Sequence, residues 1–130
     1  MADFAQQFPL GLTGEIDVVV TPELTAQHLG SGNVSVFATP EMVRLMEKAA
    51  VKAVSGNLAP GQQSVGVMVN IRHLAATPVG AKVTARAKLI GVDRRRLTFE
   101  VSAHDGIDTI GEGTHERAII DLDQFQARAS

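Results

Sequence analysis

Apolar residues between positions 39 and 54 recur at the spacing of an α-helix, and this is the clearest pattern in the chain. At about 100° per residue, the charged side chains fall on one narrow stripe and the rest of the surface is apolar. A helix that is apolar over so wide an arc is mostly enclosed by other structure. Thr39 suits the N-cap and Pro40 the first helical position. The apolar positions are Met42, Val43, Leu45, Met46, Ala49, Ala50, Val51, Ala53 and Val54.

One carboxylate interrupts the apolar arc of this predicted helix. Glu47 lies between Val43 and Val51, each one helical turn away. A carboxylate among apolar side chains loses hydration, so it needs a partner or must be held as the neutral acid. Glu47 is therefore a candidate for chemistry.

Outside this helix, apolar and polar residues mostly alternate, which is the pattern of β-strands. Residues 1–14 look like a lead-in, and residues 24–29 favour one helical turn before a loop rich in glycine and serine. The sequence predicts strands at 15–20, 64–74, 82–90, 97–103 and 108–121, and a short terminal helix at 122–128.

The strand predicted at 64–74 carries an ionisable residue on its apolar face. His73 continues the face formed by alternate apolar residues. The helix, through Glu47, and this strand, through His73, each therefore direct one ionisable group toward the expected apolar core. The apolar face comprises Val65, Val67, Val69 and Ile71, and the opposite face comprises Ser64, Gly66, Asn70 and Arg72.

The last predicted strand contains two glycines, Gly111 and Gly113, that indicate a bulge or a close approach of backbones. Alternation places Gly113, His115 and Arg117 on one face. We expect a structural or interface role for His115.

The order of elements is one strand, one long helix and four strands joined mostly by short turns, so helix and sheet are segregated. This predicts an α+β hot-dog fold, with an antiparallel sheet of about five strands wrapped around the helix. Residues 1–130 are expected to form a single domain. Such a sheet leaves an edge and some apolar surface unpaired, and a homodimer that continues the sheet would cover both.

Composition narrows the classes of function. A net charge of −2, with one basic run at 94–96, argues against nucleic acid as a partner. The chain has no cysteine, so disulfides and thiolate chemistry are excluded. No run approaches the roughly 20 apolar residues of a membrane span, and the first residues lack the features of a signal peptide. We expect a cytoplasmic protein without cofactor, metal or membrane association.

Four stretches of sequence together resemble one family. They are VFATP at 36–40, LME at 45–47, VNIRHLAATPVG at 69–80 and GEGTHER at 111–117, in the order and spacing of hot-dog thioesterases similar to fluoroacetyl-CoA thioesterase. The resemblance implies a homodimer that hydrolyses acyl-CoA thioesters with Thr39, Glu47 and His73. It also implies that Gly66 and Arg117 surround the thioester. One departure is the short connection from His28 to Val36, which lacks the aromatic lid of the fluoroacetyl-specific enzyme.

Each implied role has an ordinary structural alternative. His73 is either the general base or a hydrogen-bonded core histidine. Glu47 either attacks the carbonyl, orients a water molecule, or only holds a neighbour in place. Thr39 is an ordinary cap unless its hydroxyl meets the substrate or His73. Gly66 either offers its N–H to an oxyanion or marks a kink in the sheet. The catalytic assignment requires Glu47 and His73 to meet in an apolar pocket.

Two other functions fit the same scaffold. A hydratase or dehydratase of acyl thioesters pairs a histidine with an acid, although its usual Asp-to-His stretch is not evident here. A non-catalytic acyl-CoA-binding protein is also compatible, because a fold does not specify an activity. The prediction is an acyl-CoA thioesterase that acts on a small acyl group, delivered by coenzyme A or by an acyl-carrier protein.

Overall fold

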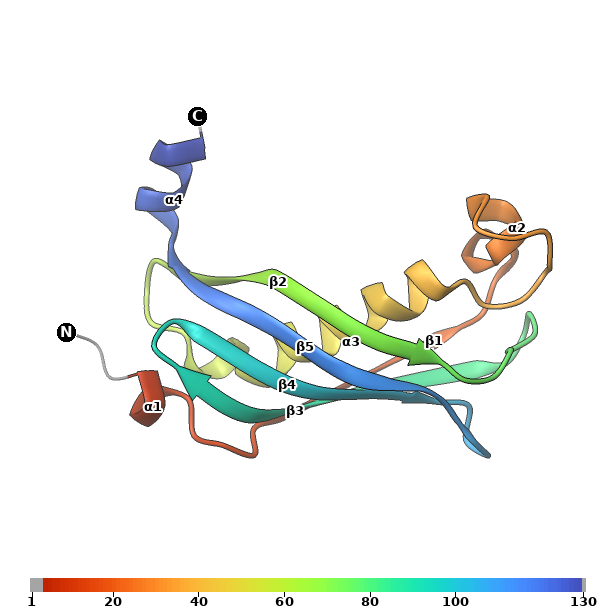
Figure 1. Cartoon of the computed structure of the whole chain (residues 1–130), viewed down its shortest axis with the longest axis horizontal. Helices are drawn as coiled ribbons and strands as arrows, with labels where there is room; N and C mark the ends of the chain where they lie inside the picture. The colour runs from red at the N-terminus through yellow and green to blue at the C-terminus, as the bar shows by residue number, and fades with distance from the viewer. Residues whose placement is uncertain (1–3, 130) are drawn as a thin grey trace.

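Five antiparallel strands form one curled sheet with a long helix on its concave side, in a computed structural model that describes residues 4–129 (Figure 1). The strands lie in the order β1-β3-β4-β5-β2, so β1 and β2 form the two edges. This confirms the predicted α+β hot-dog arrangement. The strands are β1 (Thr13–Val19), β2 (Gln62–His73), β3 (Lys82–Asp93), β4 (Arg96–His104) and β5 (Thr109–Asp121).

The long helix occupies the predicted positions, because its apolar arc is the surface that the sheet covers. Helix α3 (Thr39–Val54) buries Met42, Leu45, Met46, Ala49, Ala50, Ala53 and Val54. The helix begins at Thr39, so Ala38 and not Thr39 occupies the N-cap position. The shorter helices are α1 (Phe4–Gln7), α2 (Ala26–Leu29) and α4 (Leu122–Ala129), with 3-10 turns at Pro22–Leu24 and Ser55–Asn57.

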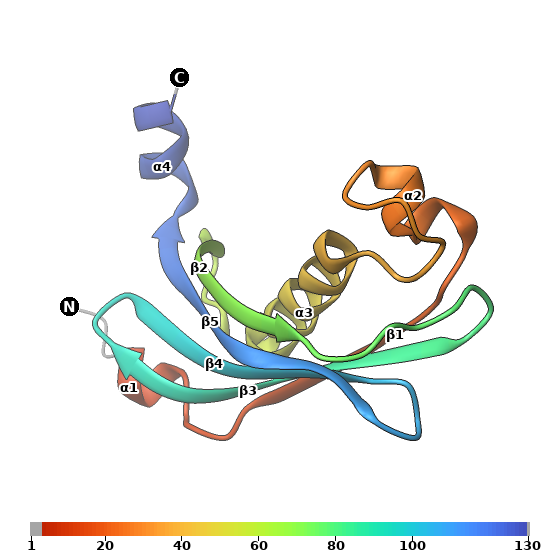
Figure 2. The same ribbon diagram turned by 45° about the vertical axis from the view of Figure 1, so that its right-hand side comes forward.

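Helix α3 lies nearer one side of the curled sheet than the other (Figure 2). It packs mainly against β1 and β3. Gly14 of β1 permits this close approach, because a Cβ at that position would collide with the carbonyl oxygen of Ala49. Fewer contacts join α3 to β2. The inner surface of β5 and β2 is therefore less covered by α3.

A β-bulge in β2 corrects the face assignment made from the sequence. Gly66 pairs with Arg117 and Met68 with Glu116, so Val67 is an extra residue in the ladder. An extra residue reverses the alternation of side chains beyond it, because the period of a strand is two. Ser64 and Gly66 consequently share the concave face with His73, whereas the sequence pattern placed them on the opposite face.

Phe4 and Phe8 belong to the folded core, so this part of residues 1–14 is more than a lead-in. Phe8 is fully buried, and Phe4 stacks on it with ring centroids 6.2 Å apart. The guanidinium of Arg95 lies 5.6 Å from the centroid of the Phe4 ring. Residues 1–3 lie outside the described part of the chain. No helix within residues 4–129 is long and apolar enough to cross a membrane.

Candidate active site

Thr39 and His73 form a hydrogen-bonded pair where α3 begins and β2 ends. The Thr39 hydroxyl lies 2.7 Å from Nδ1 of the His73 ring, and no side-chain hydrogen bond caps the helix. The Thr39 hydroxyl is therefore hydrogen-bonded to the imidazole and does not cap the helix. The sequence pattern alone left both roles open.

The other nitrogen of His73, Nε2, takes no part in the hydrogen bond to Thr39. Nε2 is buried and has no hydrogen-bond partner within residues 4–129. Burial lowers the pKa of His73, because it disfavours the charged imidazolium, and the nearby backbone of Ala75 opposes this in part. At neutral pH the ring is uncharged, so one of its nitrogens can accept a proton.

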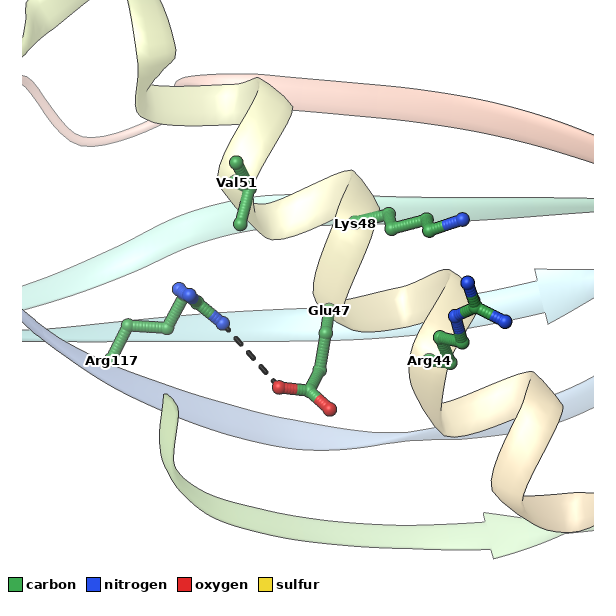
Figure 3. Close-up of a pocket in the computed structure, with 5 residues that line it drawn as sticks. All are labelled: Arg44, Glu47, Lys48, Val51 and Arg117. Atoms are coloured by element: carbon green, nitrogen blue, oxygen red, sulfur yellow. Dashed lines mark ion pairs between the residues drawn. The ribbon is translucent and has the colours of Figure 1, made fainter. Parts of the chain in front are cut away.

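Glu47 and Arg117 form an ion pair in a hollow between α3 and β5 (Figure 3). The Glu47 Oε2 atom lies 3.5 Å from Nη1 of Arg117, and the side chains are 41% and 8% exposed. The hollow measures about 320 Å³ and is lined by Arg44, Glu47, Lys48, Val51 and Arg117. The carboxylate has the cationic partner that its place in the apolar arc requires, and it remains accessible to a ligand.

Arg117 is held from several directions on the concave face of β5. Its Nε donates to the Ser64 hydroxyl at 2.9 Å and its Nη2 to the Ser64 carbonyl at 3.0 Å. Its Nη1 lies 3.2 Å from Nε2 of His115. Burial lowers the pKa of Arg117, while Glu47 raises it. The guanidinium is effectively always protonated in proteins, so Arg117 supplies a fixed positive charge beside Glu47.

Gly66, which borders the bulge in β2, faces this ion pair. A Cβ at Gly66 would lie 3.0 Å from Oε2 of Glu47 and 3.6 Å from Nη1 of Arg117. The glycine therefore leaves space beside the carboxylate that a larger residue would occupy. We call Glu47, Ser64, Gly66, His115 and Arg117 the acid–arginine cluster.

Within one chain, the Thr39–His73 pair and the acid–arginine cluster are separate. Thr39 and Glu47 are eight residues apart on α3, which is about 12 Å along the helix axis. Gly66 and His73 are seven residues apart on β2, or about 23 Å along an extended strand. The structure thus joins Thr39 to His73 and Glu47 to Gly66 and Arg117, but it does not bring His73 to Glu47 in the same chain.

Sequence reasoning missed Ser64 and gave His115 no specific contact. Alternation put Ser64 on the wrong face, because the bulge at Val67 leaves no clear signal in the pattern. His115 is buried, and its Nδ1 lies 2.8 Å from the carbonyl oxygen of Met68. Within residues 4–129, no group of three or more His, Cys, Asp or Glu residues could hold a metal ion.

A curled antiparallel sheet around one long helix defines the class of hot-dog proteins, and this one carries an acid, an arginine and an imidazole toward its concave side. Residues 20–123 match the family of fluoroacetyl-CoA-specific thioesterases, FlK. The fluoroacetyl-CoA thioesterase of Streptantibioticus cattleyicolor is 48% identical over 118 residues, which cover 86% of this chain and 85% of that protein. The chain belongs to this family.

Solved structures agree with this assignment. A variant of FlK in complex with acetyl-CoA has a TM-score of 0.86 at 45% identity, covering 92% of this chain and 95% of the other. A hot-dog-like protein from Thermanaerovibrio acidaminovorans has a TM-score of 0.90 at 24% identity, covering 98% and 95% of the two chains. The second likeness concerns the fold alone. The resemblance predicted from the four sequence stretches is confirmed.

Proposed function

We propose that the protein hydrolyses the thioester of a small acyl-CoA, releasing the free acid and coenzyme A. Family membership supports the reaction class, and the observation that carries the site is the Thr39–His73 pair. Its imidazole is uncharged at neutral pH, held at Nδ1 and unpaired at the buried Nε2. A catalytic base needs a fixed orientation and a free lone pair, and Nε2 has that lone pair in the tautomer whose Nδ1–H donates to the Thr39 hydroxyl.

Glu47 and His73 divide the chemistry between them in this proposal. The Glu47 carboxylate either attacks the thioester carbonyl and forms an anhydride, or orients the water molecule that attacks it. When Glu47 orients water, His73 takes a proton from that water and gives it to the leaving thiolate. When Glu47 attacks, the thiolate leaves first, and His73 then takes a proton from the water that opens the anhydride and passes it to the thiolate. In either route one water molecule is consumed, the carbon–sulfur bond breaks and the acid and the thiol are released.

The remaining groups stabilise charge at the carbonyl. Gly66 lies beside Glu47, so its backbone is close enough to the reacting centre to serve an oxyanion. Arg117 supplies a positive charge near the same carboxylate. Thr39 either orients His73 through its hydrogen bond or donates to the substrate carbonyl.

The acyl group is small, but selection for fluorine is not expected. Variants of FlK have been crystallised with fluoroacetate and with acetyl-CoA. In this chain the connection from His28 to Val36 has no aromatic residue, so no bulky ring is available there to close over the acyl group. We expect acetyl-CoA and other short acyl-CoA esters to be hydrolysed at rates similar to that of fluoroacetyl-CoA.

A homodimer accounts for the separation between the two parts of the site. Strand β2 is a sheet edge of 12 residues, with Val67 and Val69 exposed by 46% and 40%, and Val51 of α3 exposed by 41%. Pairing of β2 with β2 of a second copy would cover these residues. A two-fold axis runs the paired strands in opposite directions. The His73 end of one strand then extends toward Gly66 and Glu47 of the second copy.

The reaction is tested with purified protein and a panel of acyl-CoA esters of increasing chain length, in an assay for free thiol. Thiol release that is fastest for the shortest esters supports the proposal. An absorbance change at the alkene without thiol release would instead indicate hydration. Binding without turnover would indicate a non-catalytic acyl-CoA-binding protein.

Assembly of one site from two copies is tested by mixing inactive variants. Glu47→Gln and His73→Ala homodimers should each be inactive, but the mixed dimer contains one site in which both groups are intact. Equal mixing gives heterodimers for half of the molecules, so about a quarter of wild-type activity should return for a two-fold dimer. No recovery in a verified heterodimer would show that both groups come from the same copy. The cytoplasmic location and the single-domain extent of residues 1–130 stay predictions.

A further inference from the structure

Several contacts define the position of the Arg117 guanidinium that faces Glu47. Ser64 accepts two hydrogen bonds, at 2.9 Å and 3.0 Å, which fix one edge of the group. Nη1 is the atom that faces Glu47, and its other neighbour is Nε2 of His115 at 3.2 Å. Ser64 thus holds one edge of the planar guanidinium, and His115 is the side chain that supports the Nη1 end facing the carboxylate.

The contacts of His115 require one protonation state. A guanidinium has only donors, so Nε2 of His115 must accept the hydrogen bond from Nη1 and carry no proton. The Met68 carbonyl has only lone pairs, so Nδ1 of His115, at 2.8 Å, must carry the proton and donate it. Both neighbours thus select the same neutral tautomer, with hydrogen on Nδ1.

We propose that His115 is a positioning residue for the reaction: as the neutral Nδ1–H tautomer it holds Arg117 against Glu47, and its protonation releases that contact. A protonated ring would turn Nε2 into a second donor facing Nη1 and would place two positive charges about 3.2 Å apart. The effect on catalysis rests on the proposed function, whereas the tautomer and the contact do not.

The surroundings of His115 decide when this change happens. Its ring stacks on Phe99 of β4 with centroids 6.2 Å apart, and this neighbour carries no charge. The charged groups that act on it are Arg117 and Glu116 of β5 and Glu47 of α3. Burial is the largest influence and lowers the pKa of His115; Arg117 lowers it further, while the Met68 carbonyl and the two carboxylates raise it. The ring is therefore neutral at physiological pH and takes up a proton only in acid.

The tautomer is measured directly by nitrogen NMR. The ¹⁵N shifts of the His115 ring, assigned from the spectrum of His115→Gln, should at pH 7.5 show a protonated Nδ1 and a bare Nε2. On acidification the Nη signals of Arg117 should shift with the same midpoint as the His115 ring. A ring protonated at Nε2, or an imidazolium at pH 7.5, would overturn the proposal even if the protein is an active thioesterase.

A matched pair of variants separates positioning from simple packing. His115→Gln places an amide oxygen where Nε2 accepts from Arg117, and it cannot become cationic. His115→Asn reaches the Met68 carbonyl but is too short to contact Arg117. We expect His115→Gln to keep kcat within about threefold, and His115→Asn to lose about tenfold or more in kcat with KM changed less, because misplacing a catalytic group costs rate.

The acid limb of the pH profile gives a second readout. In the wild type both His73 and His115 must be unprotonated, so log kcat/KM should fall in acid with a slope approaching two. In His115→Gln only the His73 protonation remains, and the slope should approach one. An unchanged slope in His115→Gln, or wild-type kcat in a folded His115→Asn, would overturn the proposal. If no variant or wild-type protein releases thiol, the proposed reaction fails while the NMR result still decides the tautomer.

Discussion

Two ion pairs on consecutive residues of β5 have opposite surroundings. Glu116 points to the convex face and pairs with Arg96 at 3.3 Å, with side chains 23% and 57% exposed. Arg117 points to the concave face and pairs with Glu47 at 3.5 Å, with side chains 8% and 41% exposed. The pleat of one strand therefore sends one charge toward water and the next toward the interior.

The Arg96–Glu116 pair is shorter than the Arg117–Glu47 pair, but we expect it to contribute less to stability. Exposed pairs such as Arg96–Glu116 contribute about 0–1 kcal/mol, because water screens the attraction and holding two long side chains in place costs entropy. A buried arginine that loses its partners is left as an uncompensated charge, so each of its contacts matters more. The environment of a charge, and not the distance to its partner, decides whether it can serve a site.

Neutralising Glu47 or Glu116 should give the largest difference in kcat between the two ion pairs. Glu47→Gln is expected to lower kcat by about a hundredfold or more, since removal of an acid–base group or nucleophile usually costs this much. Glu116→Gln keeps the same change of charge on the convex face and should leave kcat within about twofold. Steady-state thiol release measures both. Equal kcat values for the two variants would remove Glu47 from the chemistry.

Replacing Arg117 or Arg96 by lysine should give the next largest difference, in kcat and in the free energy of unfolding. Lysine cannot present the planar set of donors that Arg117 gives to Ser64, His115 and Glu47. Arg117→Lys should therefore lower kcat about tenfold and the unfolding free energy by about 2 kcal/mol. Arg96→Lys should change the unfolding free energy by less than about 1 kcal/mol. Urea titration and the thiol assay together measure these effects, and equal stability losses would contradict the contrast.

A methyl group added beside Glu47 should affect activity more than stability. In Gly66→Ala the new Cβ would lie 3.0 Å from Glu47 Oε2, so the carboxylate must move by a few tenths of an ångström. We expect kcat to fall about tenfold, because small displacements of a reacting group are costly. Gly91→Ala is the control, since its Cβ would meet Thr98 at an ordinary 3.6 Å. Wild-type kcat in Gly66→Ala would show that the carboxylate position is not critical.

The two faces should also lose stability in different ranges of pH. Burial lowers the pKa values of His73 and His115 from 6.5, so the unfolded chain binds their protons first as the pH falls. Their contribution to stability is complete above pH 6.5 and is lost progressively below it, down to the folded pKa values. A urea titration series across pH should show this loss, and His115→Gln should reduce it.

On the convex face, the hydrogen bond from Thr84 and then Lys82 lower the pKa of Asp17 from 3.8. Its contribution is complete above pH 3.8 and is lost only as the pH falls through the lower, folded value. The Asp17→Asn variant should therefore flatten only the most acidic part of the stability curve. A change between pH 5 and 6.5 in Asp17→Asn would contradict this assignment.

The sequence by itself determined the elements and the unusual residues. A period of 3.6 in apolar positions defined α3, and alternation defined the strands. Both patterns are local, so they can be recognised without knowledge of the fold. Glu47 and His73 stood out because each is ionisable at a position where its own element is otherwise apolar. The short stretches around Thr39, His73 and Arg117 were specific enough to indicate the family.

Only the tertiary structure decided which of these residues meet. The Thr39–His73 hydrogen bond spans 34 residues, and the contacts from Arg117 to Ser64 span 53, so no local pattern encodes them. The bulge at Val67 moved Ser64 and Gly66 to the concave face, because one extra residue reverses a period of two. The neutral state of His115 likewise follows from its neighbours, a guanidinium and a carbonyl that three-dimensional packing brings to its two nitrogens.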